Sequence, residues 1–116
     1  MPSMTNAEPL WLLTLSLRPG LQDLTAWSDE DQQAVGAHFQ GLQEQARAGR
    51  LVLAGRSQDQ DSETRLADNT IGVAIFHAAD REAALAVAEA DPAVRAGVMR
   101  FELRSFAIAA ARDGVS

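Results

Sequence analysis

The sequence predicts an α+β fold of the ferredoxin-like βαββαβ type, an antiparallel sheet with two helices on one face. Three observations predict this class. Four segments alternate as strands do, two repeat apolar residues with helical spacing, and their order is strand, helix, strand, strand, helix, strand. The chain has 116 residues, 47% of them hydrophobic, which suits one core rather than two. We therefore expect a single domain at residues 10–108 and flexible termini at 1–9 and 109–116.

A strand, a helix and a second strand make up the first half of the domain. Leu10–Leu17 (LWLLTLSL) is the first strand. After a loop, Ser28 caps a helix whose first turn is acidic, as the helix dipole favours. The helix runs to about Ala48 and ends before Gly49, because glycine tolerates the left-handed conformation that often follows a helix. Arg50–Ser57 is predicted as the second strand.

The second half opens with a polar segment and closes with a strand. Gln58–Asp68 (QDQDSETRLAD) predicts a mobile hairpin loop, because it holds few apolar residues. Asp80 caps a second helix that runs through Ala90. The other predicted elements are a third strand at Asn69–His77, a short helical turn at Pro92–Gly97 and a last strand at Val98–Ile108.

Both faces of the predicted sheet carry apolar residues, although helices cover only one of them. In the first strand, Leu10 and Leu12 lie on the face opposite Trp11. In the last strand the apolar phase changes from Leu103 to Phe106, which indicates a β-bulge or a strand that crosses to a neighbouring sheet. An exposed second face would be an unusual apolar patch for a monomer. We therefore predict a homodimer in which two sheets pack face to face.

Composition argues against several function classes. The net charge is −6 and the ten basic residues are scattered arginines, which argues against a nucleic-acid partner. No apolar run approaches the roughly 18 residues of a membrane span, and the N-terminus lacks the basic start of a signal peptide. With no cysteine, no metal-ligand spacing and no phosphate-binding glycine loop, we expect no metal and no cofactor. A cytoplasmic location fits this composition.

His38 is a candidate site residue on the first helix. The predicted core stripe of that helix consists of Val35, Phe39, Leu42 and Ala46. His38 lies at the edge of the stripe, with the small residues Ala34 and Gly41 on the same side and Gln45 two turns further on. Small neighbours leave room for a ligand around the imidazole. Two interpretations stay open, a ligand-binding histidine or a half-buried one that bonds to a backbone carbonyl.

Asp91 has two compatible interpretations. An aspartate directly before Pro92 is a good N-cap for a new helical turn. Helical spacing also places Asp91 on one face with Ala84, Val87 and Ala88, so its carboxylate points inward. A capping carboxylate near an imidazole can also orient that imidazole.

Three further polar residues lie at predicted strand ends. Arg18 and Arg56 follow or end the first and second strands and could bind an anionic substrate, with solvated or ion-paired arginines as the alternative. His77 ends the third strand and is expected near its rim.

Three segments resemble the YCII-related family: WSDE followed by AHFQGL around His38, AGRLVLAG at the start of the second strand, and ADPAVRAG around Asp91. The similarity covers roughly Leu10 to Phe106. It implies a dimeric α+β barrel whose pocket holds the helix histidine, here His38, and the aspartate of the Asp-Pro pair, here Asp91. It also implies that this pair performs acid–base chemistry on small, often ring-derived substrates in some members.

Two positions depart from the family pattern. Val35 stands where an arginine is frequent, three residues before the histidine, and Arg56 stands where a proline often follows Gly55. A differently shaped pocket or a lost activity would follow from either change.

Two classes of function stay open. In the first, the protein is an enzyme in which His38 is the general base or acid and Asp91 orients it. The reaction would be proton abstraction, elimination or isomerisation of a small organic molecule, which can carry an anionic group. Arg18, Gln45 and Arg56 are the predicted substrate contacts. In the second, the protein is a non-catalytic dimer that binds a small ligand or serves as an accessory protein.

Overall fold

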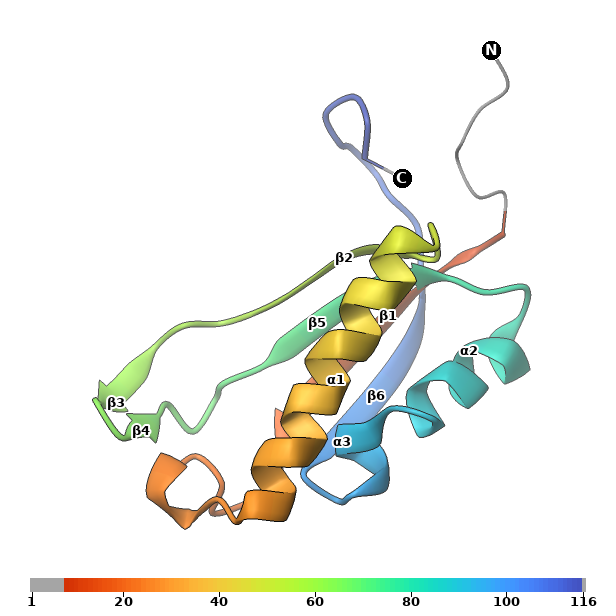
Figure 1. Cartoon of the computed structure of the whole chain (residues 1–116). Coiled ribbons are helices and arrows are strands. Elements are labelled where there is room, and N and C mark those ends of the chain that lie inside the picture. Colours follow the sequence, from red (N-terminus) through yellow and green to blue (C-terminus); the bar gives the residue numbers. More distant parts are fainter. Residues whose placement is uncertain (1–7, 116) are drawn as a thin grey trace.

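A four-stranded antiparallel sheet with helices on one face confirms the predicted α+β class (Figure 1). The computed structural model describes residues 8–115. Its helical elements are the 3₁₀ turn η1 (Leu24–Ala26), α1 (Asp29–Arg47), α2 (Arg81–Glu89) and α3 (Pro92–Arg95). Its strands are β1 (Leu10–Leu17), β2 (Leu51–Arg56), β3 (Gln60–Ser62), β4 (Arg65–Leu66), β5 (Gly72–His77) and β6 (Met99–Phe106).

The strand order in the main sheet is β2-β5-β1-β6, with every pair antiparallel. Leu13 of β1 lies opposite Ala74 of β5 and Leu103 of β6, and all three are buried under the helices. Paired residues share a face, so this register places one apolar row of each strand in the core. The alternation predicted for the first strand is therefore confirmed.

The helices begin where the capping residues predict. Ser28 accepts a hydrogen bond from the Asp31 amide, and the Asp31 carboxylate accepts one from the Ser28 amide. These reciprocal bonds form a capping box, which satisfies two amides at the start of α1. At its end, Gly49 has a φ of 80°, a conformation that favours glycine. Asp80 caps α2 through the Ala83 amide.

Two clusters form the core. The first joins α2 to the sheet through residues such as Ala84 and Ala88, which have no exposed surface. The second is smaller and joins α1 to α3 through residues that include Val35, Ala93 and Val98. Figure 1 shows α1 and α2 on the same face of the sheet, with α1 beside α3 and towards β2, and α2 towards β6.

The buried line of α1 differs from the predicted stripe. Val35 and His38 are buried, with 8% and 4% of their surface exposed, whereas Phe39 is 50% exposed and Ala46 is also exposed. The helix is rotated so that positions 35, 38 and 42 face inward. Placing Phe39 in the core was therefore wrong. Hydropathy favours the larger apolar side chain, but a contact described below holds the imidazole inside.

The segment after β2 is more structured than a plain loop. It contains the two-stranded hairpin β3–β4, which extends beyond the ends of β2 and β5 (Figure 1). Leu66 is buried, and its amide bonds to the carbonyl of Gln22. A turn follows the hairpin, in which the Thr70 amide donates to the Ala67 carbonyl, and β5 begins at Gly72 rather than at Asn69. The predicted mobility of the segment stays a prediction.

Of the two explanations for the apolar phase change in the last strand, the β-bulge is wrong. The pairing of β6 with β1 is unbroken from Met99 to Phe106, so the last strand has no bulge. Phe106 lies opposite Leu10, on the face that the helices leave open. The irregularity lies in β2, between Leu51 and Leu53.

The predicted flexible termini are only partly within the described residues. Residues 1–7 and 116 lie outside them. Residues 107–115 follow β6 without a helix or strand.

Candidate functional site

A direct contact between His38 and Asp91 joins α1 to the start of α3. Nδ1 of His38 lies 2.5 Å from Oδ2 of Asp91, and the two side chains are 5% and 13% exposed. The two residues are 53 positions apart in the chain. The pair is therefore a product of the tertiary fold, formed where two helical elements meet on the sheet.

Asp91 uses its two oxygens for different partners. Oδ1 accepts hydrogen bonds from the amides of Ala93 and Val94, at 2.8 and 3.3 Å, and so caps α3. Oδ2 contacts His38. The cap that the Asp-Pro sequence predicts is confirmed, and the same carboxylate also orients an imidazole.

The environment of Asp91 keeps its carboxyl ionised. Burial raises the pKa of this group, but the hydrogen bond and the charge of His38, together with the Ala93 and Val94 amides, outweigh burial. The pKa of Asp91 therefore lies below its ordinary value.

An ionised carboxylate accepts hydrogen bonds and cannot donate them. Nδ1 of His38 must therefore carry the proton in the contact with Asp91. When the ring is neutral, Nε2 then holds the free lone pair, and no described residue is hydrogen-bonded to it. Asp91 thus selects the tautomer in which Nε2 is the basic atom.

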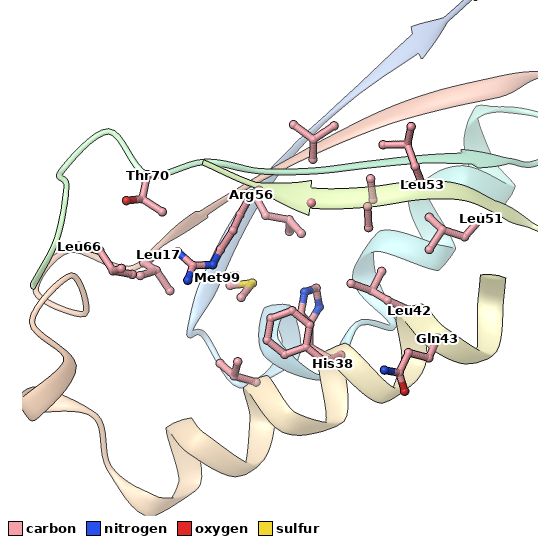
Figure 2. Close-up of a pocket in the computed structure, with 18 of the residues that line it drawn as sticks. Leu17, His38, Leu42, Gln43, Leu51, Leu53, Arg56, Leu66, Thr70 and Met99 are labelled. Carbon is pink, nitrogen blue, oxygen red and sulfur yellow. The ribbon is translucent and has the colours of Figure 1, made fainter. Parts of the chain in front are cut away.

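A cavity of about 670 Å³, here the large cavity, lies between α1 and the edge of the sheet formed by β2. His38 lines it from α1 and Arg56 from β2, and Figure 2 shows the two side chains entering the same space from opposite walls. Most of its other lining residues are apolar, including Leu42, Leu66 and Met99.

A second hollow of about 360 Å³, here the small cavity, lies on the other side of the pair. Asp91, Gln45 and Arg50 line it, beside Gly41. A Cβ added to Gly41 would have no heavy atom outside its own helix within 4 Å, so this glycine borders open space. Leu42, Leu51 and Ala74 line both cavities. The His38–Asp91 pair therefore stands in the wall between the two spaces.

The structure brings some predicted site residues together and separates others. His38 and Arg56 share the large cavity, while Asp91 and Gln45 share the small one. Arg18 lines neither cavity. Its guanidinium donates to the carbonyl of Gly97 at 3.1 Å and lies 3.8 Å from the Asp31 carboxylate.

Two residues have different places from those that sequence reasoning assigned. Phe39 lines the large cavity and packs against the His38 ring edge to face, with centroids 5.2 Å apart. The sequence feature that could have placed Phe39 at the site is its position next to His38. His77 is buried rather than at a rim. Its Nδ1 lies 2.7 Å from the Glu8 carbonyl, and its Nε2 is buried and has no hydrogen-bond partner among residues 8–115.

Within residues 8–115, no three His, Cys, Asp or Glu side chains gather as a metal-binding group would require. No helix of this part of the chain has the length and apolar character needed to cross a membrane.

Comparison with known protein families matches the YCII-related domain to residues 10–107. No curated protein matches the chain. Among solved structures, the chain is similar to 5-chloro-2-hydroxyhydroquinone dehydrochlorinase (TftG) from Burkholderia phenoliruptrix AC1100, in complex with 2,5-dihydroxybenzoquinone. The similarity has a TM-score of 0.57 and 19% sequence identity, and covers 84% of this chain and 93% of that one. At this identity the two proteins share a fold.

Proposed function

This chain belongs to the YCII-related family, and we propose that it is an enzyme acting on a small organic molecule. His38 is the general acid or base, and Asp91 holds its imidazole in position. The reaction class is proton abstraction, elimination or isomerisation. The observation that carries the proposal is the contact of Nδ1 with the Asp91 carboxylate, because it directs the basic Nε2 away from Asp91.

Histidine suits this role because its ordinary pKa of about 6.5 lets it take and return a proton near neutral pH. Asp91 keeps the ring from rotating and favours one tautomer, so no reorganisation is needed when substrate binds. With Nε2 as the acceptor, a proton leaves a carbon or hydroxyl of the substrate and the imidazole becomes a cation. The ionised carboxylate of Asp91 stabilises that cation.

The large cavity fits a small substrate. Its volume of about 670 Å³ lies within the roughly 300–1,000 Å³ of ordinary ligand pockets, and its walls are mostly apolar. The similar structure is that of a dehydrochlorinase with a quinone ligand. Dehydrochlorination removes a proton and a chloride, so a positioned base is what such an elimination needs. Both points favour a ring-sized substrate.

The proposed enzyme is a cytoplasmic homodimer. On the face of the sheet away from the helices, apolar side chains of neighbouring strands lie side by side, with Leu12 opposite Ile75 and Leu10 opposite Phe106. Leu53 on the same face is 46% exposed. Packing two such faces together would remove this apolar surface from water. The absence of cysteine fits a reducing compartment.

A second candidate is a non-catalytic dimer that binds a small ligand. Val35 favours it, because this residue is buried beside the large cavity at a position where the family often has an arginine. In this alternative the cavity binds a molecule without converting it.

Turnover and binding separate the two candidates. We would measure chloride release from 5-chloro-2-hydroxyhydroquinone and, by calorimetry, binding of 2,5-dihydroxybenzoquinone. The wild type should release chloride, and His38→Ala should lower the rate by about 10²–10⁴-fold. Gln40→Ala is the matched control on the exposed side of α1 and should keep the wild-type rate. Circular dichroism checks that each variant folds.

Three results would each contradict one part of the proposal. Binding without turnover in the wild type favours the non-catalytic dimer. Equal turnover in His38→Ala and the wild type shows that His38 is not the acid–base group. If the wild type shows no binding and no turnover, this substrate class is excluded.

A further inference from the structure

Arg56 reaches the large cavity because of the irregularity in β2. Leu51 lies opposite Phe76, and Leu53 lies opposite the adjacent Ile75, so β2 has one extra residue, Val52, at this point. Such a bulge shifts the alternation of side chains along the rest of its strand. Counted from Leu51 without the bulge, Arg56 would point to the open face of the sheet.

With the bulge, Arg56 points to the helix face. It lies opposite Gly72, and Gly72 lies opposite Leu15, a core residue under the helices. Figure 2 shows the result, with the Arg56 side chain directed into the cavity and Leu53 directed away from α1. Gly72 has no side chain, so nothing across the strand pair covers the guanidinium from that position.

The guanidinium has little to neutralise it. Among the described residues it donates to the carbonyl of the next residue, Ser57, at 3.3 Å, and it makes no ion pair. The chain has 16 acidic residues, yet no Asp or Glu is among the described residues that line the large cavity. An acidic protein therefore has a ligand cavity whose fixed charge is one arginine.

We propose that the large cavity selects organic anions: molecules with an apolar, ring-sized body and a carboxylate or ionised hydroxyl that pairs with Arg56. Guanidinium binds such oxygens through two parallel hydrogen bonds, which orient the ligand as well as hold it. Anchored there, the ring lies along the apolar walls and its reacting edge reaches His38. That last step rests on the proposed function; the preference for anions does not.

Matched ligand pairs test the preference. Benzoate and benzamide share a ring and nearly a shape but differ in charge, and so do 2,5-dihydroxybenzoquinone and 2,5-dimethoxybenzoquinone. Calorimetry should show the wild type binding the charged member of at least one pair more tightly. A preference in the first pair alone identifies a carboxylate, and one in the second alone identifies an ionised hydroxyl.

Variants then assign that preference to Arg56. Arg56→Gln should weaken binding of the preferred anion by about 2–5-fold, because Arg56 is exposed and solvent screens its charge, and leave the neutral probe unchanged. Arg56→Lys should recover part of the loss. Arg47→Gln removes an exposed arginine of α1 that lines neither cavity, so it controls for net charge and should bind as the wild type does.

Deleting Val52 tests the bulge itself. Without the extra residue Arg56 turns to the open face, and anion binding should fall as in Arg56→Gln. If the deletion prevents folding, Arg56→Gln decides the matter alone.

Equal binding of charged and neutral probes by the wild type, or equal binding by Arg56→Gln and Arg47→Gln, would overturn the inference. These results are independent of catalysis. If His38→Ala keeps full turnover while Arg56→Gln loses the anion, the proposed function is wrong and the inference stands.

Discussion

Helices α1 and α2 cover the same face of one sheet but pack against it differently. The buried residues of α2 are Ala84 and Ala88, which have no exposed surface. The buried residues of α1 are Val35 and His38, and the neighbouring Phe39 is half exposed over a cavity of about 670 Å³. The α2 helix therefore packs closely on the sheet, whereas a cavity remains between part of α1 and the sheet.

This difference separates two tasks within one small fold. Close packing of small side chains stabilises the α2 side, because a dense interior leaves no space of molecular size. On the α1 side the chain leaves apolar surface uncovered, and the helix is held partly by the polar contact from His38 to Asp91. A binding space arises where packing is incomplete, and its polar groups are positioned by hydrogen bonds.

The largest expected effect comes from Asp91→Ala. Loss of the α3 cap should cost about 0.5–2 kcal/mol. Leaving the buried imidazole of His38 without its partner should add about 1–3 kcal/mol. Urea unfolding measures the sum. Asp91→Asn keeps a capping oxygen and should lose much less, since asparagine caps nearly as well. If Asp91→Ala is as stable as the wild type, α1 depends on apolar packing as α2 does, and the comparison fails.

Overpacking should distinguish the two helices almost as strongly. Ala88→Leu inserts three carbons where no surface is exposed, so it should cost about 1–3 kcal/mol of unfolding free energy. Ala46→Leu makes the same change on α1, at an exposed residue beside the large cavity, and should stay within about 0.5 kcal/mol of the wild type. Equal losses in the two variants would mean that the large cavity is closed in solution.

The ionised carboxylate of Asp91 also predicts that the free energy of unfolding depends on pH through the α1 side of the molecule. The folded pKa of Asp91 lies below its unfolded value of about 3.9, so its charged form stabilises the fold above that pH. The stabilisation is lost as pH falls through the lower, folded pKa. The difference in unfolding free energy between wild type and Asp91→Asn should therefore shrink as pH falls below about 4. A constant difference from about pH 5 downward would contradict this linkage.

The smallest expected effect is a gain in stability. Gly41→Ala on α1 should raise the unfolding free energy by up to about 1 kcal/mol, because alanine favours helix and the added Cβ meets open space. Gly36→Ala, on the exposed side of the same helix, is the control and should gain a similar amount. A loss in Gly41→Ala alone, measured by urea unfolding, would show that the small cavity is filled.

Local signals predicted most of the fold. Alternation located β1 to the residue, and the Ser28 cap and Gly49 located α1 within one residue at each end. The rotation of α1 and the bulge in β2 were not predictable in this way. The first depends on Asp91, which is 53 residues from His38, and the second on pairing with β5. Because the run LVLA in β2 is apolar in both phases, its pattern holds no information about register.

The same limit applies to the candidate site. The faces of the two helices and the family resemblance pointed to His38 and Asp91, since each has a local pattern. Arg18 and Arg56 looked equivalent, because both lie at strand ends. One is bonded to Gly97 and the other lines the large cavity, a difference that only the register of the sheet decides.

The two oxygens of Asp91 affect how relatives of this protein should be interpreted. Since Oδ1 begins α3, selection for folding alone is enough to retain the aspartate in a lineage that has lost its reaction. The histidine has no such second role, because among the described residues its imidazole is hydrogen-bonded only to the Asp91 carboxylate and begins no helix. An Asp-Pro pair in a relative therefore indicates the start of a helix and does not by itself indicate activity. Under the proposed function, the residue aligned with position 38 is the one expected to separate active relatives from inactive ones.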